Sequence, residues 1–371
     1  MKILWLNWKD RGHPAAGGAE VVLWELSKRL VAEGHEVTLL TCGYAGAVGR
    51  EVVDGITVIR VGASRYAHSF QALLHYIRRL RNRFDIVIEV VNTAPYFSVF
   101  FGKKSRRLLF YHQLAREIWH HETKPPLSHF GRFVLEPFAT RLLSRAGVAT
   151  ITISESTRQD LGRFGFRADR THIIPQGMQF QPVKSLSDII KFAKPTMLSL
   201  GTLRAMKRTK DQLVAFELAK RHLPDLQFKI AGLANDRYGK EVLHAIQNSP
   251  FADDIEYLGR ITDEEKLQLM QQSHIITVTS VKEGWGLIVS EAASQGTPAV
   301  VYDVDGLRDS VRHRETGLVT ATNPDALSKG ILALLADSQT YRRLQRAAWQ
   351  WSRELNFDNA YLGFKNILER A

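Results

Sequence analysis

The hydrophobic positions of this chain fall into two alternating patterns. A short apolar run at the start, "KILWLNW", is followed by the stretch "GGAEVVLWELSKRLVAEG". Apolar residues of that stretch recur at the spacing of one helical face, at Ala19, Val22, Leu23, Leu26 and Leu30, and Gly34 is placed to end the helix. Three later runs are apolar throughout, as expected of strands covered on both faces: 84–91, 106–112 and 148–154.

The same alternation restarts in the second half of the chain. Strand-like and helix-like runs follow one another again, and Thr262 with Glu265 forms the pattern of a helix-capping box. Between the two series, residues 175–195 contain three prolines and no clear period. The pattern predicts an α/β protein with two Rossmann-like, doubly wound domains, 1–180 and 190–355. Ligand sites are expected at the carboxyl ends of their parallel strands.

Length and composition agree with this organisation. A chain of 371 residues exceeds one ordinary hydrophobic core, and 44% hydrophobic with 24% charged residues is typical of a globular protein. Cys42 is the only cysteine, which excludes a disulfide framework and a cysteine metal cluster. No stretch is long and apolar enough for a membrane span or a signal sequence. We expect a cytoplasmic protein whose membrane contact is peripheral, at the inner face of the cell membrane.

Positive charge is concentrated in the first half of the chain. Residues 1–180 hold 25 Lys and Arg against 15 Asp and Glu, whereas residues 181–371 hold 25 against 23. A net charge of +10 against +2 indicates an anionic partner for the first half: a membrane, a nucleic acid or a phosphorylated substrate. Basic residues are interleaved with aromatic and aliphatic ones in a predicted helix, 75–84, and in the segment 101–111. An ordinary solvated surface is the alternative.

The stretch "EGWGLIVSEAASQGTPAV", residues 283–300, carries the strongest candidate chemistry. Because it follows an apolar run, Glu283 is predicted in a strand-to-helix loop and Glu291 about five residues into the helix. The helix start offers unpaired main-chain N–H groups, and Gly284 and Gly286 let a phosphate approach them closely. The two carboxylates are suited to accept hydrogen bonds from ribose and from a second polyol. A ligand that contains a phosphate, a ribose and a second polyol, joined in a row, is a sugar nucleotide.

This stretch closely resembles the Glu-x7-Glu motif of the retaining glycosyltransferases of family 4, which have the GT-B fold. Further matching segments follow in the family's order: "GGAE" (17–20), "YH" (111–112), "ISESTRQDL" (153–161), "HIIPQG" (172–177), "LGTLRAMKRTKDQLVAF" (200–216) and "VYDVDGLRDSVRHRETGLV" (301–319). The resemblance implies that the first domain binds the acceptor and that the second binds the nucleotide-sugar donor, facing each other across a central cleft. The amphipathic segment 356–371 is then expected to cross back onto the first domain.

The resemblance also implies roles for individual residues. The catalytic residues would be His112 beside the donor sugar, Glu283 on its hydroxyls and Lys207 on the diphosphate, and Glu291 would bind the ribose. The other donor-binding residues would be Gly17 and Gly18 at the phosphate, Arg204 at the diphosphate, Gly284, Trp285, Gly286 and Leu287 at the sugar and phosphate, and Arg260 and Ile261 at the base. Thr202 stands where the family usually has Arg, and Arg204 is expected to supply that charge.

No metal and no cofactor are expected beyond the substrate, a UDP- or GDP-sugar. The "DVD" sequence at 303–305 mimics a metal-binding Asp-x-Asp motif, but it falls in a predicted turn, and no cluster with metal-ligand spacing accompanies it. No enzymatic nucleophile stands out. The resemblance therefore implies attack on the same face of the sugar, with the leaving diphosphate taking the acceptor's proton.

The predicted activity is transfer of a hexose-type sugar to an acceptor hydroxyl in the synthesis of a cell-surface glycan or glycolipid. A GT-B epimerase or phosphorylase would bind similar ligands, but neither acid–base residues for an epimerase nor a cofactor lysine for a phosphorylase stand out. A nucleic-acid-binding protein is disfavoured because no nucleic-acid recognition motif is present. The acceptor is expected to be lipid-linked, a glycan or another hydroxyl compound, presented to the basic first domain at an anionic membrane surface.

Overall fold

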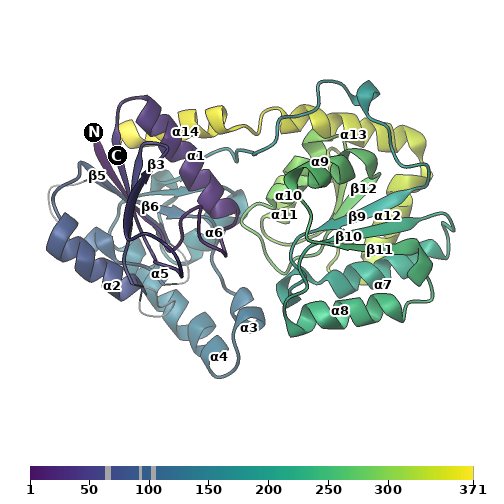
Figure 1. Ribbon diagram of the computed structural model, residues 1–371, viewed down its shortest axis with the longest axis horizontal. Helices are drawn as coiled ribbons and strands as arrows, with labels where there is room; N and C mark the ends of the chain where they lie inside the picture. Colours follow the sequence, from purple (N-terminus) through teal and green to yellow (C-terminus); the bar gives the residue numbers. More distant parts are fainter. Residues whose placement is uncertain (63–67, 92–93, 102–105, 371) are drawn as a thin grey trace. The chain divides into compact units, whose positions relative to one another are not determined.

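The computed structural model describes residues 1–62, 68–91, 94–101 and 106–370, which form two compact units (Figure 1). The first unit consists of residues 1–177 and 356–371, and the second of residues 178–355. Each unit contains one sheet flanked by helices. None of the described helices is long and apolar enough to cross a membrane.

An eight-stranded sheet forms the centre of the first unit. Its order is β3-β4-β2-β1-β5-β6-β7-β8, and its described pairs are parallel except β3 with β4. The strands are β1 (Lys2–Leu6), β2 (Glu36–Thr41), β3 (Arg50–Val53), β4 (Ile56–Arg60), β5 (Ile86–Val91), β6 (Arg106–Tyr111), β7 (Ala149–Thr152) and β8 (Thr171–Ile173). The helices are α1 (Gly18–Ala32), α2 (His68–His75), α3 (Ile118–Glu122), α4 (Leu127–Phe130), α5 (Glu136–Ser144), α6 (Glu155–Arg163) and α14 (Phe357–Arg370). The three runs predicted as buried strands are β5, β6 and β7, so these predictions are confirmed.

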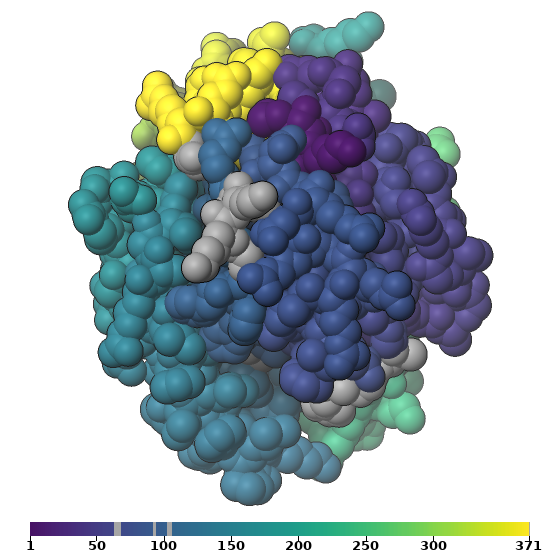
Figure 2. Space-filling view, turned by 90° about the vertical axis from the view of Figure 1, so that its left-hand side faces the viewer, coloured from purple at the N-terminus to yellow at the C-terminus, as the bar shows by residue number. Residues whose placement is uncertain are grey.

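Helix α14 closes the first unit against α1 and β1. Its Phe364 ring stacks on Trp5 of β1, with ring centroids 5.6 Å apart. Two ion pairs join it to α1 and the turn that follows: Arg29 with Asp358 at 2.8 Å, and Lys365 with Glu33 at 2.8 Å. Figures 1 and 2 both show α14, in yellow, beside the purple N-terminal segment. The last segment of the chain is thus part of the core of the first unit.

The second unit is built on a six-stranded parallel sheet in the order β11-β10-β9-β12-β13-β14. The strands are β9 (Thr196–Leu200), β10 (Gln227–Ala231), β11 (Ile255–Gly259), β12 (Ile275–Val278), β13 (Ala299–Tyr302) and β14 (Gly317–Thr320). The helices are α7 (Thr209–Lys220), α8 (Arg237–Gln247), α9 (Asp263–Gln272), α10 (Leu287–Ser294), α11 (Leu307–Ser310), α12 (Pro324–Ala336) and α13 (Ser338–Ser352). The predicted capping box is confirmed, because Thr262 accepts from the Glu265 amide and Glu265 accepts from the Thr262 amide.

Both faces of this second sheet are covered, which explains its uninterrupted apolar runs. Successive strand residues point to opposite faces. Met197 packs in a cluster with α7, α8 and α12, whereas its neighbour Leu198 packs in a cluster with α9, α10 and α11. Ile275 and Ile276 of β12 divide in the same way. A ligand can therefore approach this sheet at the ends of its strands, where they continue into loops, and not at its faces.

The basic segment 75–84 is only partly the helix that its sequence predicts. Helix α2 ends at His75 and continues for one π-helical turn, η1 (Tyr76–Leu80), before Asn82 turns the chain with φ 62°. Four arginines of this segment are exposed: Arg78, Arg79, Arg81 and Arg83. Figure 2 shows this part of the first unit at its surface, in blue.

The second basic segment, 101–111, is described only in part. Residues 102–105 lie outside the described residues, and Phe101 is half-buried. Residues 106–111 are strand β6, in which the side chains from Leu108 to Tyr111 are buried in the sheet. The expectation that these apolar residues contact a membrane is therefore wrong, because they form the core of the first unit.

Candidate functional site

The strand order of the second unit contains one point at which the winding of the chain reverses. From β9 the chain runs outward through β10 to β11, and it then returns to β12 on the other side of β9. In open parallel sheets, ligands bind beyond the carboxyl ends of the strands that flank such a reversal. Those strands are β9 and β12, which lead into residues 201–208 and 279–286.

Lys207 and Glu283, one from each of these segments, form an ion pair at this point. The Lys207 Nζ lies 2.5 Å from the Glu283 Oε1, and the Ser280 hydroxyl donates to the same oxygen at 2.6 Å. Their side chains keep 27% and 17% of their accessible surface, so a ligand can reach both. The structure therefore brings these two predicted site residues together, with Ser280 as an additional partner that had not been predicted.

Main-chain contacts hold the two segments against each other. Lys207 ends a short 3₁₀ turn, η6 (Ala205–Lys207), and Arg208 follows it with φ 52°. The Val281 amide donates to the Met206 carbonyl at 2.8 Å, and the Thr279 hydroxyl donates to the Lys207 carbonyl at 2.9 Å. Because these hydrogen bonds join the two loops directly, they fix the positions of Lys207 and Glu283 relative to each other.

A second loop supports Glu283 from behind. The Glu283 amide donates to the Asp305 carbonyl at 3.0 Å. Gly306 has φ 81°, and a Cβ at this position would lie 2.2 Å from the Glu283 carbonyl oxygen. Any larger residue at 306 would therefore push the Glu283 loop away, and this loop contact requires glycine.

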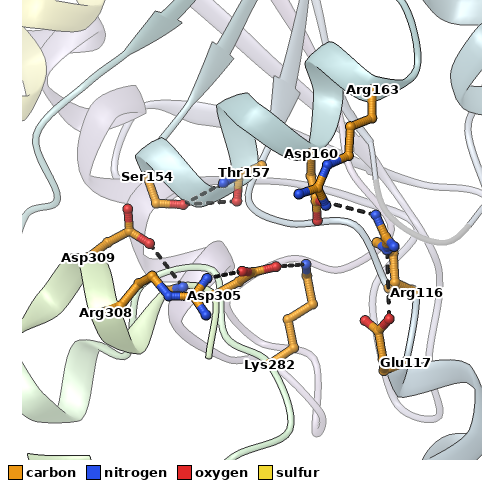
Figure 3. Close-up of polar contacts among 12 residues, drawn as sticks. Arg116, Glu117, Ser154, Thr157, Asp160, Arg163, Lys282, Asp305, Arg308 and Asp309 are labelled. Carbon is orange, nitrogen blue, oxygen red and sulfur yellow. Dashed lines mark hydrogen bonds and ion pairs between the residues drawn. The ribbon is translucent and has the colours of Figure 1, made fainter. Parts of the chain in front are cut away.

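The carboxylates of the "DVD" sequence are paired with basic side chains of the protein. Lys282, which is buried, pairs with Asp305 at 2.5 Å, and Arg308 bonds Asp305 from the other side (Figure 3). Arg308 also bonds Asp303 at 2.7 Å. Burial acts to raise the pKa of Asp305, but the bonds from Lys282 and Arg308 hold it below its ordinary value. Within the described ranges, no group of three or more His, Cys, Asp or Glu side chains is arranged to hold a metal ion.

The start of helix α10 lies next to the Lys207–Glu283 pair in sequence. Gly286 caps it with φ 88°, and a Cβ there would lie 2.8 Å from the Leu307 side chain. In the part of the chain that the structure describes, the amides from Trp285 to Ile288 have no main-chain acceptor. The Trp285 indole donates to the Ser290 hydroxyl at 2.8 Å, which fixes the loop. Open amides and the helix dipole favour an anion at this position.

Glu291 lies on α10 as predicted, but it already has a partner. Lys266, from α9, places its Nζ 2.7 Å from the Glu291 Oε2, and Glu291 is only 6% exposed. The other oxygen, Oε1, makes no hydrogen bond within the described residues. Arg260 and Ile261 lie just before α9, exposed and half-buried respectively, and Arg204 is exposed at the start of η6.

The glycine pair of the first unit is engaged within the protein. The Gly17 amide donates to the Glu20 Oε2 at 2.7 Å, and Gly18 is the first residue of α1. Glu20 is buried and also approaches the Lys9 ammonium at 3.5 Å. The acid of "GGAE" therefore holds the start of the helix in place, a role that the motif had not revealed.

His112 follows β6 and is half-buried. Its ring lies 4.7 Å from that of Phe110, and its imidazole makes no hydrogen bond within the described residues. Burial lowers the pKa of His112 to about 4. The imidazole is therefore neutral at neutral pH.

A buried carboxylate fixes the loop that follows His112. Glu136 of α5 accepts the Ala115 amide at 2.5 Å and the Arg116 amide at 2.7 Å. Arg116, which has φ 40°, then pairs with Asp160 of α6 at 2.9 Å (Figure 3). Sequence reasoning missed Glu136 because its partners lie about twenty residues earlier in the chain.

Two doubly wound sheets, with a lysine–carboxylate pair and open helix amides at the reversal point of the second, define the class of GT-B glycosyltransferases. A model of Glycosyltransferase Family 4 matches residues 16–180, and a model of Glycosyl transferases group 1 matches residues 187–351. Together they cover most of the chain. The protein belongs to the family 4 type of GT-B glycosyltransferases.

Individual relatives agree with this assignment. The D-inositol 3-phosphate glycosyltransferase of Xylanimonas cellulosilytica is 25% identical over 96% of this chain and 92% of its own. The sucrose-phosphate synthase of Thermosynechococcus elongatus has a similar structure, with a TM-score of 0.81 at 20% identity, covering 100% of this chain and 98% of the other. A protein of Anabaena solved in complex with UDP-glucose has a TM-score of 0.74 at 15% identity, covering 100% of both chains.

Proposed function

We propose that this glycosyltransferase moves a hexose-type sugar from a UDP- or GDP-sugar to an acceptor hydroxyl with retention of configuration. The acceptor belongs to a cell-surface glycan or glycolipid. The observation that carries the proposal is the Lys207–Glu283 pair, 2.5 Å apart, at the carboxyl ends of β9 and β12. It joins a cation suited to a diphosphate and a carboxylate suited to sugar hydroxyls at one point.

The donor is assigned to the second unit. Lys207 and Arg204 bind the diphosphate together with the amides from Trp285 to Ile288. Glu283 accepts hydrogen bonds from the sugar hydroxyls, and the Oε1 of Glu291 accepts one from the ribose. Lys266 orients the Glu291 carboxylate through its contact at 2.7 Å. Arg260 and Ile261 lie at the base, and the Anabaena relative with bound UDP-glucose supports a nucleotide-sugar donor.

In the proposed reaction, the acceptor oxygen forms a bond to the anomeric carbon on the face from which the diphosphate leaves. The bond between that carbon and the diphosphate oxygen breaks, and the acceptor proton passes to the leaving diphosphate. Lys207 and the α10 amides stabilise the charge that develops on the diphosphate. A neutral His112 beside the sugar adds no positive charge where the anomeric carbon becomes cationic. No metal step is proposed, because side-chain cations and amides supply the positive charge.

Calorimetry with UDP, GDP and ADP tests the donor assignment, and proton NMR of the glycoside product tests retention. We expect micromolar or tighter binding of UDP or GDP, and a product with the donor's anomeric configuration. An inverted product would refute the same-face mechanism while leaving the donor site intact. Absence of binding to every nucleoside diphosphate would refute the donor site itself.

A further inference from the structure

One helical segment of the first unit exposes most of its large apolar side chains instead of burying them. Helix α4, the π-helical turn η3 (Gly131–Leu135) and α5 run on without interruption from residue 127 to 144. Its outward side chains are large and apolar, with exposed fractions of 47% for Leu127, 52% for Phe130, 62% for Phe133, 51% for Val134, 38% for Leu135 and 65% for Phe138. Single exposed apolar residues are ordinary, but six within twelve positions are not.

The inward face of the same segment is mostly small or polar. Its buried residues are Ser128, Gly131, Glu136, Ala139, Thr140 and one large apolar residue, Leu143, which packs in a core cluster of the unit. Gly131 lies against Trp119, where a Cβ would be 2.3 Å from the indole ring, and Glu136 accepts the loop amides described above. Packing against the unit therefore accounts for Leu143, but it does not account for the six exposed apolar side chains on the other side.

Basic side chains predominate around this apolar face. Between residues 123 and 145 the basic residues are Lys124, Arg132, Arg141 and Arg145, and the acid is Glu136, which points inward. Arg132 is paired with Glu117 at 3.0 Å, whereas Arg141 and Arg145 lie beside the exposed rings. Arg141 and Arg145 also line a surface cavity of about 260 Å³ together with Phe133, Val134 and Phe138. The face therefore offers apolar rings next to guanidinium groups, which matches the acyl and headgroup layers of an anionic bilayer.

We propose that residues 127–145, here called the apolar-basic helix, dock the protein onto an anionic membrane surface. The phenylalanines enter the boundary between headgroups and acyl chains, while Arg141 and Arg145 bind lipid phosphates. A second copy of the chain fits less well, because two such faces would bring like charges together. The exposed arginines at 78–83 lack an apolar group of this kind and contribute only long-range attraction. This inference concerns the first unit and is independent of the proposed donor.

Vesicle sedimentation of the full chain tests the proposal. The wild type should pellet with phosphatidylcholine vesicles that contain phosphatidylglycerol and much less with phosphatidylcholine alone. Phe133→Ser/Phe138→Ser should lower the partition coefficient by about tenfold or more, since binding scales with buried apolar area. Phe70→Ser is the matched control, because Phe70 of α2 is also 65% exposed. Unchanged UDP or GDP affinity and an unchanged melting temperature show that each variant is folded.

A labelled variant reports the location directly. The only native cysteine, Cys42, is buried, so a polarity-sensitive dye on Phe133→Cys labels one accessible site. Its emission should shift to the blue when anionic vesicles are added, whereas a dye on Phe70→Cys should not respond. Equal sedimentation of Phe133→Ser/Phe138→Ser and the wild type, or no shift at position 133, refutes the proposal. Wild-type dimers that disappear in Phe133→Ser/Phe138→Ser without vesicle binding would instead identify a second copy as the partner.

Discussion

Replacing Lys207 by methionine removes the proposed diphosphate cation with little change in volume. In the unliganded protein its Nζ lies 2.5 Å from Glu283, and its side chain keeps 27% of its surface exposed. A hydrogen bond to a charged group contributes about 1.5–3 kcal/mol. Lys207→Met should therefore weaken UDP or GDP binding by roughly 10- to 150-fold. Lys210→Met is the matched control. Lys210 of α7 pairs with Glu241 of α8 at 2.6 Å, and its loss should leave nucleotide affinity unchanged.

The partner variant separates the two roles of the ion pair. Because Glu283 competes with the diphosphate for Lys207, Glu283→Gln should leave nucleoside diphosphate affinity unchanged or tighten it by up to about tenfold. Sugar transfer should fall, since the sugar hydroxyls lose their charged acceptor. Lys207→Met/Glu283→Gln should bind nucleotide as weakly as Lys207→Met alone. Calorimetry with UDP and GDP measures all four proteins, and wild-type affinity in a folded Lys207→Met would refute the site.

Three further predictions follow from side chains with perturbed or paired charges. Lys266→Met should lower the free energy of unfolding in urea by about 1–3 kcal/mol, because Glu291 loses its partner; Lys266→Met/Glu291→Gln should recover part of that loss. In the unfolded chain His112 takes up a proton near its ordinary pKa of 6.5, whereas in the folded protein its pKa is about 4. Protonation therefore favours the unfolded state between these values. The free energy of unfolding should fall by up to about 3 kcal/mol through this residue as the pH is lowered from 6.5 to 4. His112→Gln should show a shallower pH dependence, and an equally steep one would contradict the assignment. Transfer should persist in excess chelator, and activity that vanished there and returned with Mn²⁺ or Mg²⁺ would show a metal requirement.

Much of the fold was predictable because doubly wound sheets have a simple sequence pattern. Strands buried on both faces give uninterrupted apolar runs, and helix ends carry local signals such as Gly34 and the Thr262 capping box. The approximate positions of Glu283 and Glu291 followed from the same pattern. Contacts between distant segments did not. Lys266 reaches Glu291 across 25 positions, and Glu136 reaches the Ala115 amide across 21.

The apolar-basic helix shows a different limit of sequence reasoning. Its apolar residues recur at helical spacing, which ordinarily indicates a core-facing stripe. The pattern identifies a stripe but not the side on which the rest of the protein lies. That side is set by the Ala115 and Arg116 amides, which donate to Glu136, and by Trp119, which leaves room only for a glycine at position 131. Residues 106–111 supported two expectations, a buried strand and a basic and apolar surface, and the structure has the buried strand.

The packing of α14 on Trp5 has a consequence for how the chain is made. Residues 178–355 are contiguous, so the second unit can fold as soon as they leave the ribosome. The first unit cannot complete its folding at that stage. Its residues Trp5, Arg29 and Glu33 contact Phe364, Asp358 and Lys365, which are synthesised more than 300 residues later. During translation the sheet of the first unit therefore leaves one face of the Trp5 indole uncovered until Phe364 has been made. The first unit is completed only after the whole of the second unit has been synthesised.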